Sequence, residues 1–128
     1  MRPRYADLFQ RMRDPDPVLS DAAFDAVLFD REDAIPDLVD CYHLSKKDDE
    51  LRFFVVQLLG FSGSRKALPT LLLALDDREP KVRAEACRSL EDISARETIP
   101  ALEARLADLD EDVRVAAAEA LLEIRKTG

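Results

Sequence analysis

Few side chains in this sequence are of types that perform catalysis. The one histidine, His43, follows Tyr42, and a general base or a metal ligand needs partner groups held nearby. Aspartates and glutamates are abundant, but on amphipathic helices such carboxylates are normally solvated, and without histidine they make a weak case for magnesium or calcium. The segment Gly60–Ser64 has two glycines but no phosphate-loop lysine, so it is interpreted as a helix stop. The sequence therefore predicts no catalytic residue, no metal site and no cofactor, and hence a non-enzymatic protein.

The two cysteines are also predicted to be structural. Neither has a neighbouring histidine or the Cys-x-x-Cys spacing that lowers a thiol pKa, and two cysteines do not make a disulfide framework. In the alignment of the internal repeats Cys87 matches Ala118, which predicts a small buried hydrophobe. Cys41 matches Ala74 and Arg105, so we expect it to be partly exposed.

One charged pattern recurs at a fixed spacing. Asp77 and Arg83 lie six residues apart, as do Asp108 and Arg114. This spacing places an acid in a turn near an arginine on the following helix. An exposed ion pair of this kind contributes about 0.2–1 kcal/mol to the free energy of unfolding. The position six residues before Arg52 is Lys46, so we expect the pattern to end or to be rerouted there.

The elements that carry these charges form an internal repeat of two short helices. In each copy an apolar residue and a proline open the first helix, an acidic turn follows, and the second helix begins with an apolar residue and an arginine. The openings are Ala34-Ile35-Pro36, Ala67-Leu68-Pro69 and Thr98-Ile99-Pro100, and the second helices begin at Leu51-Arg52, Val82-Arg83 and Val113-Arg114. The three arginines lie 31 residues apart. Two short helices cannot bury their apolar faces alone, so this period predicts a stacked array.

The segments Pro80–Ala86 and Glu111–Ala117 resemble the HEAT-like repeats first described in phycobilisome lyases. The resemblance covers residues 34–128, and a weaker first copy is indicated because Ala22–Val27 matches Ala116–Leu121 in pattern. It implies an all-α, armadillo-like fold, a short right-handed α-solenoid of about four helix pairs. The repeats then fall roughly at 4–32, 33–64, 65–96 and 97–128 of a single domain, 1–128. The resemblance also implies that Asp77, Arg83, Asp108 and Arg114 form an Asp–Arg ladder that links neighbouring turns.

The function that the resemblance implies is protein binding, as an adaptor or as a regulatory or assembly scaffold. The alternative is a bilin lyase-like, chromophore-handling subunit. Some similar proteins are DNA glycosylases with a basic groove lined by aromatic residues, whereas this chain has no tryptophan and no basic stripe. Deoxyhypusine hydroxylase binds iron through His-Glu pairs, and this chain contains no such pair.

Composition argues against nucleic acid and membrane partners. The 128 residues carry a formal net charge of −8, and acidic residues outnumber basic ones in both halves, whereas nucleic-acid binding relies on Lys and Arg. The apolar runs are too short to span a membrane. The segment Met1–Tyr5 is basic but has no apolar stretch behind it, so no secretory signal is predicted and a cytoplasmic protein is expected.

The binding surface is predicted on the second helices, which usually line the concave side of such a solenoid. Alignment by the arginines gives the rows Phe53, Ala84 and Val115, then Gln57, Arg88 and Glu119, then Phe61, Asp92 and Glu123. The candidate protein-binding residues are Phe53, Gln57, Phe61, Arg88, Val115, Glu119 and Leu122. Phe53 and Phe61 have two interpretations: they are exposed anchors beside Arg88, or they fill space against the first repeat.

Three expectations concern the core and the end of the array. The helix at about 50–61 is apolar all round, which predicts burial on all sides. Leu90 and Leu121 occupy one core position, and Leu106 is expected to point inward. The last helix has an additional stripe of Val115, Ala118 and Leu122, which predicts that a partner or a second copy covers it, as in a homodimer through the C-terminal helix.

Overall fold

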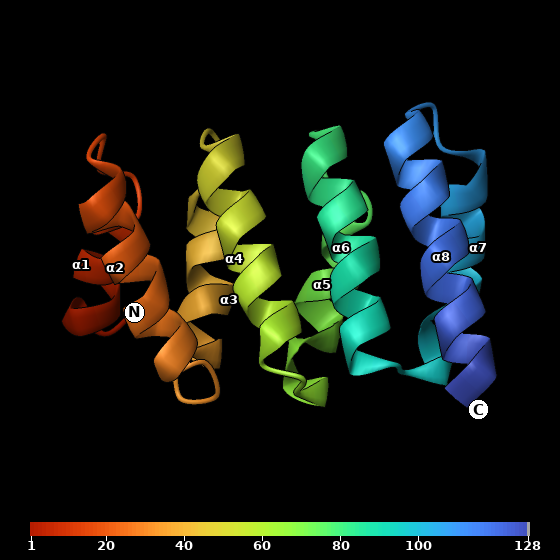
Figure 1. Cartoon of the computed structure of the whole chain (residues 1–128), viewed down its shortest axis with the longest axis horizontal. Coiled ribbons are helices and arrows are strands. Elements are labelled where there is room, and N and C mark those ends of the chain that lie inside the picture. The colour runs from red at the N-terminus through yellow and green to blue at the C-terminus, as the bar shows by residue number, and fades with distance from the viewer. Residues whose placement is uncertain (128) are drawn as a thin grey trace.

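The computed structural model describes residues 1–127, and these residues form helices only, joined by turns. The helices pair in chain order, and the pairs stand side by side in a row (Figure 1). The α-helices are α1 (Pro3–Arg11), α2 (Pro17–Phe29), α3 (Ile35–Leu44), α4 (Asp49–Phe61), α5 (Leu68–Ala74), α6 (Pro80–Ile93), α7 (Ile99–Ala104) and α8 (Glu111–Thr127), and the short 3₁₀ helices are η1 (Arg65–Ala67), η2 (Arg96–Thr98) and η3 (Arg105–Ala107). The predicted all-α solenoid is confirmed.

The second helix of every pair begins in a similar way. Asp16, Asp48 and Glu79 each cap a second helix by accepting a hydrogen bond from a backbone N–H in its first turn. Asp110 does the same at α8 by accepting from the N–H of Val113 at 3.1 Å. The starts at residues 17, 49, 80 and 111 place the weaker first copy in register with the others. We call residues at the same distance from these starts equivalent.

The first helices of the third and fourth repeats, α5 and α7, are shorter than α1 and α3. A 3₁₀ helix precedes each of them, η1 before α5 and η2 before α7. Pro69 and Pro100 lie in the first turn of the α-helical parts. A proline fits there because its missing N–H has no intrahelical acceptor, so each α-helix begins one residue before its proline.

The core runs along the row between the two helix layers. Leu90 and Leu121 are both buried, so their predicted core position is confirmed. The second helices approach closely at Gly60, where a Cβ atom would lie 2.5 Å from the Ser89 Oγ. The same Ser89 hydroxyl donates to the backbone oxygen of Val56 at 3.0 Å. A glycine is therefore required for α4 and α6 to pack at this distance.

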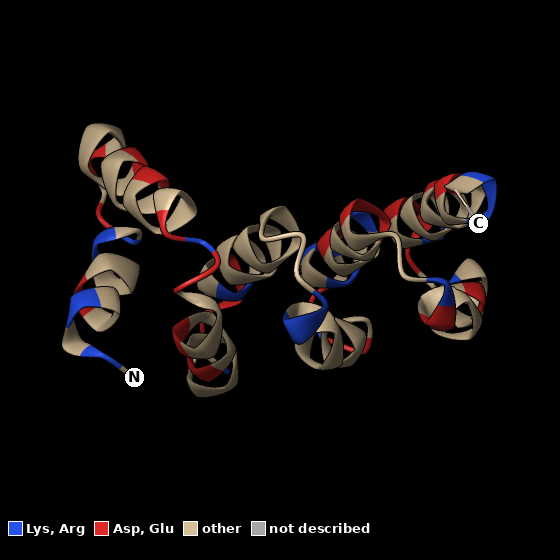
Figure 2. Cartoon of the chain, turned by 90° about the horizontal axis from the view of Figure 1, so that it is seen from below, with Lys and Arg blue, Asp and Glu red and all other residues tan. Residues whose placement is uncertain are grey.

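The row of helix pairs is curved. Viewed from below, α2, α4, α6 and α8 line the inner side of a shallow arc, and α1, α3, α5 and α7 lie on the outer side (Figure 2). The turns inside the pairs lie along one edge of the row (Figure 1). Exposed side chains of the four second helices consequently form one continuous concave surface.

Three burial predictions were wrong. The helix α4 is not buried on all sides, because Phe53 and Phe54 are half-buried and Phe61 is exposed on the concave side. Leu106 is exposed, whereas its equivalent Leu75 in the third repeat is buried against the fourth. Cys41 is buried because its position on α3 faces the core, and its sulfur contacts the Ser45 hydroxyl at 3.6 Å.

Candidate protein-binding surface

Arginine–aspartate pairs join the turns of neighbouring repeats along the edge of the array. The Arg52 guanidinium donates from Nε and Nη2 to the two carboxylate oxygens of Asp77, at 2.9 and 3.0 Å. Arg83 bonds Asp108 in the same bidentate way, with both distances 3.0 Å. Each of these pairs, which we call rungs, connects one repeat to the next, and such fork-to-fork pairing fixes orientation as well as distance.

The rung geometry differs from the sequence expectation in pairing and in burial. The Asp77 carboxylate bonds Arg52 of the preceding repeat, whereas Arg83, six residues after Asp77, bonds the Asp77 backbone oxygen. At the turn before α4, where the pattern was expected to end or be rerouted, the backbone oxygen of Lys46 accepts from Arg52 Nη1. The pairs are also buried rather than exposed, since the side chains of Arg52 and Asp77 are only 4% and 5% exposed. Burial arises because the carboxylate faces the preceding repeat and is covered by it.

The electrostatics of Asp77 show that its pairing outweighs its burial. Desolvation raises the pKa of a buried carboxyl, yet the hydrogen bonds from Arg52, the Glu79 N–H and the Tyr42 hydroxyl lower the pKa of Asp77 below its ordinary value. The Tyr42 hydroxyl donates to Asp77 Oδ2 at 2.8 Å. The rungs therefore hold ionised carboxylates and serve to position the repeats.

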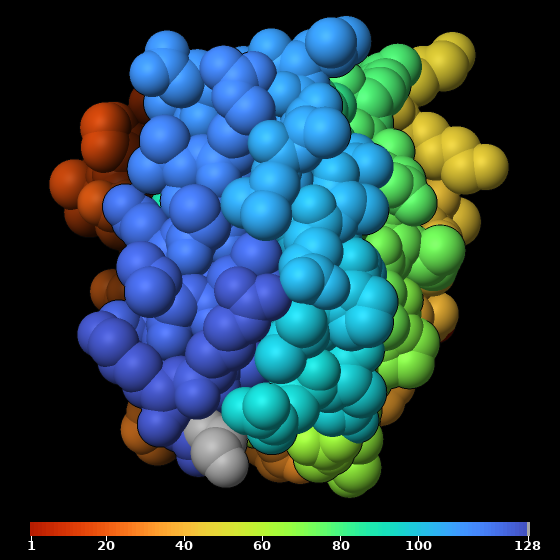
Figure 3. All heavy atoms as spheres, turned by 90° about the vertical axis from the view of Figure 1, so that its right-hand side faces the viewer, coloured from red at the N-terminus to blue at the C-terminus, as the bar shows by residue number. Residues whose placement is uncertain are grey.

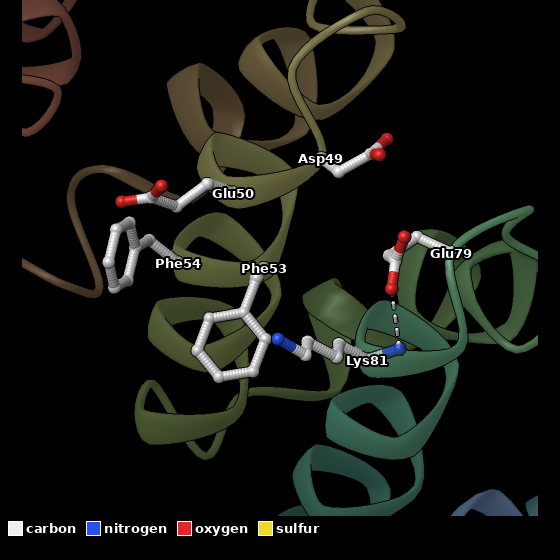
Figure 4. Close-up of a pocket in the computed structure, with 6 residues that line it drawn as sticks. All are labelled: Asp49, Glu50, Phe53, Phe54, Glu79 and Lys81. Atoms are coloured by element: carbon white, nitrogen blue, oxygen red, sulfur yellow. Dashed lines mark hydrogen bonds between the residues drawn. The ribbon is translucent and has the colours of Figure 1, made fainter.

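A hollow of about 460 Å³ opens on the concave surface between α4 and α6. It is lined by Asp49, Glu50, Phe53, Phe54, Glu79 and Lys81 (Figure 4). Figure 4 shows the Lys81 side chain extended toward the Phe53 ring. We call this site the aromatic hollow, because two half-buried phenylalanines supply its apolar wall.

Further hollows adjoin the aromatic hollow along the concave surface. One of about 200 Å³, toward the first repeat, is lined by Met12, Ser20, Asp21, Phe24, Phe54 and Gln57. One of about 230 Å³, toward α8, is lined by Phe53, Glu79, Pro80, Lys81, Ala84, Arg88, Asp110 and Asp112. Because Phe53 and Phe54 are shared between hollows, the three form a series that crosses all four repeats.

The hollows bring together some of the predicted binding residues. Phe53, Gln57 and Arg88 line them. Phe61 is exposed but lies two turns further along α4, outside these linings. The remaining candidates, Val115, Glu119 and Leu122, are exposed on α8 and do not line the hollows.

The sequence interpretation missed Phe54, which the aromatic packing shows to be central. Its ring meets the Phe24 ring of the first repeat edge-on at 6.0 Å, and it meets Phe53 at 5.7 Å. The space-filling role considered for Phe53 and Phe61 is thus performed by Phe54. One signal was available, because Phe54 is equivalent to Ala116, a position that faces the preceding repeat.

Residues 69–127 match the family model of HEAT repeats. The third and fourth helix pairs are HEAT repeats, and the four pairs together form a HEAT-like solenoid. The match covers the third and fourth helix pairs, whose second helices carry Arg83 and Arg114. HEAT repeats generally mediate protein–protein interaction. No curated protein sequence matches this chain. Within residues 1–127, no helix is both long and apolar enough to cross a bilayer.

The concave surface of this HEAT-like solenoid has a second zone, which is acidic. It comprises Glu91 and Asp92 on α6 and Glu119 and Glu123 on α8. Burial raises the pKa of Glu91, and the charges of Glu123, Asp92 and Glu119 raise it further, while Arg88 acts in the opposite direction. Partial desolvation also raises the pKa of Asp92, although its side chain is exposed. Repulsion within this acidic zone would be relieved by a cation.

The residues considered for catalysis lie apart from these hollows. His43 is exposed on α3, and its ring packs edge-on against Tyr42 at 5.5 Å. Cys41 and Cys87 are free thiols, and burial raises the pKa of Cys41 to about 11 and that of Cys87 to about 12. Among residues 1–127, no group of three or more His, Cys, Asp or Glu side chains is arranged to hold a metal ion.

Proposed function

We propose that this HEAT-like repeat protein is a non-enzymatic adaptor or assembly scaffold whose concave surface binds a partner segment carrying an apolar anchor beside lysine or arginine. The observation that carries the proposal is the pairing of the aromatic hollow with the acidic zone on one surface. Arg88 lines the hollow next to the aromatic one and acts electrostatically on Glu91, so the two zones are neighbours.

The apolar part of such a partner would contribute most of the binding free energy. Phe53 and Phe54 are half-buried, so an aliphatic or aromatic side chain entering the aromatic hollow would remove apolar surface from water at about 25 cal/mol per Å². Aromatic residues in partly enclosed hollows are typical hot spots of protein interfaces.

The acidic zone would set the charge preference of the partner. Burial is the main cause of the raised pKa of Glu91, and repulsion by the neighbouring carboxylates raises it further, so a basic partner side chain gains attraction and relieves repulsion at once. Electrostatic complementarity of this kind acts mainly on association rate and specificity.

The test uses two synthetic peptides that differ only in charge. Both carry two leucines at helical spacing, one has lysines and the other glutamates at the remaining exposed positions, and binding is followed by fluorescence anisotropy. We expect the lysine peptide to bind the wild-type chain and to lose about tenfold in affinity with Phe53→Ser. Leu73→Ser, an exposed leucine on the outer helix α5, is the matched control.

Three results would reject the proposal. They are equal binding of both peptides, equal binding to wild type and Phe53→Ser, and loss of binding with Leu73→Ser. Absorbance of the chain mixed with a linear tetrapyrrole tests the bilin lyase-like alternative, because a bound bilin changes its visible spectrum. Affinity capture followed by mass spectrometry would then identify the natural partner.

A further inference from the structure

The C-terminal end of the solenoid exposes positions that are buried in the third repeat. Leu106 is 43% exposed, whereas its equivalent Leu75 is 2% exposed. Ala118 is exposed, and its equivalents Val56 and Cys87 are both fully buried. Figure 3 looks onto this end, where α7 and α8 form a broad face. We call it the C-terminal face, comprising Leu106, Val115, Ala118 and Leu122.

The N-terminal end exposes the complementary positions. Leu19 on α2 is 53% exposed, although its equivalents Val82 and Val113 are fully buried against the preceding repeat. Ala22 is exposed, although its equivalents Glu85 and Ala116 are buried. Ala26 is half-buried, although its equivalents Leu58, Ser89 and Ala120 are buried. We call Leu19, Ala22 and Ala26 the N-terminal face, because each lies where a later repeat contacts the repeat before it.

Each end also carries half of a rung. Arg114 is equivalent to Arg52 and Arg83, and its Nη1 donates to the backbone oxygen of Asp108 at 2.7 Å, as Arg83 Nη1 does to that of Asp77. Within residues 1–127, however, no carboxylate bonds the Nε and Nη2 edge of Arg114. That edge is the one that binds aspartate in the other two arginines.

The matching carboxylate lies at the opposite end. Asp14 is equivalent to Asp77 and Asp108. Its Oδ1 accepts a hydrogen bond from the backbone N–H two residues later at 2.8 Å. Asp77 and Asp108 accept the corresponding hydrogen bonds at 3.0 Å. Within residues 1–127, no arginine or lysine side chain forms an ion pair with the Asp14 carboxylate. Asp14 thus presents the acceptor half of a rung in the same local geometry.

We propose that copies of this chain associate head to tail, with the C-terminal face of one copy packed on the N-terminal face of the next. Arg114 of one copy then bonds Asp14 of the following copy, and the ladder continues across the junction. Ala118 meets Ala26 as Val56 meets Ser89 inside the array. Leu122 is equivalent to Gly60, whose close contact with Ser89 has no space for a Cβ atom, so α8 of one copy stands farther from α2 of the next than α4 stands from α6.

A second copy fits better than an unrelated partner because both halves of the rung and both apolar faces are present on the same chain. The contact is heterologous, so it leaves one face free at each end and forms open chains or closed rings rather than a symmetric dimer. Copies repel one another through their net charge of −8, but at about 0.15 M salt this long-range repulsion is screened beyond about 8 Å. The rung acts at contact distance.

Sedimentation velocity from micromolar to near-millimolar concentration tests the proposal. We expect the mass of the wild-type chain to rise with concentration, and Arg114→Asp or Asp14→Arg to weaken association about tenfold or more. The double variant Asp14→Arg/Arg114→Asp should recover association, because it rebuilds the rung with the charges exchanged. Circular-dichroism melts establish that each variant is folded.

Face-blocking variants distinguish head-to-tail association from a symmetric dimer. Leu122→Glu blocks only the C-terminal face and Leu19→Glu only the N-terminal face, so each should be monomeric alone, while an equal mixture should form dimers and nothing larger. Leu73→Glu, with similar exposure on α5, should associate like wild type. A wild-type chain that stays monomeric throughout overturns the proposal, as does a Leu19→Glu variant that still dimerises alone.

Discussion

The Arg52 guanidinium and the Asp77 carboxylate form a bidentate ion pair between two repeats, and both side chains are almost completely buried. Neither charge could be left alone there, because an unpaired buried ion loses its hydration without compensation. The pair therefore makes the second and third repeats interdependent, and the same holds for Arg83 and Asp108 in the third and fourth.

Removing one member of the buried pair should be strongly destabilising. Asp77→Ala leaves the Arg52 guanidinium buried without its main acceptor, which typically costs about 3–5 kcal/mol. The free energy of unfolding from urea titration measures the loss. The control is Asp76→Ala, since the neighbouring Asp76 side chain is 79% exposed. Similar small losses for both variants would mean that the pair adds no net stability over its desolvation cost.

The rungs should also govern the acid limb of the stability profile. The pKa values of Asp77 and Asp108 are lowered in the folded state, so the folded chain binds fewer protons there than the unfolded chain. The rung contribution is therefore complete above the ordinary aspartate pKa of about 3.9 and is lost as the pH falls through the lower folded values. Urea midpoints measured from neutral to acidic pH should fall less steeply for Asp77→Ala than for wild type. Parallel curves would contradict this.

The shared core position of Leu90 and Leu121 gives a test of the repeat register. Both leucines are buried in the packing between second helices and their neighbours, so replacement of either by alanine should cost about 2–5 kcal/mol. Leu73→Ala, at an exposed position of α5, should cost far less. The measurement is chemical denaturation, and a loss below about half a kcal/mol at Leu90 would contradict the buried assignment.

The repeat period was sufficient to predict the fold, because each helix pair buries its apolar face against a copy of itself. The same logic predicted the burial of Leu90 and Leu121, whose neighbours are supplied by the repeat. It failed for Leu106, because burial at this position differs between repeats: Leu75 is buried, whereas Leu44 is exposed. The period therefore does not determine burial there.

The binding surface was only partly predictable from the sequence. The rows by themselves identified Phe53, Gln57 and Arg88, which line the hollows. They did not identify Phe54, because the rows followed positions expected on the concave surface, whereas Phe54 faces the preceding repeat and contacts Phe24 there. The period also does not show that Phe54 is half-buried while its equivalent Ala116 is buried.

The acidic zone should lower the stability of the free protein while it strengthens binding of a basic partner. The pKa of Glu91 is raised in the folded state by burial and by the neighbouring carboxylates, so its ionised form is penalised on folding. This penalty is absent at a pH low enough to protonate Glu91 in both states and is complete above its folded pKa. Glu91→Gln removes the charge, so we expect its melting temperature at neutral pH to exceed that of wild type, with the difference shrinking as the pH falls.

The same substitution should weaken binding of the lysine peptide, because it removes one carboxylate that attracts the partner. Glu32→Gln is the matched control, since this exposed glutamate lies in the turn before α3, outside the acidic zone. Thermal melts followed by circular dichroism and anisotropy titrations of the peptide measure the two effects. A Glu91→Gln variant that is less stable than wild type would show that Glu91 is held by favourable contacts, and unchanged peptide affinity would remove the acidic zone from the binding surface.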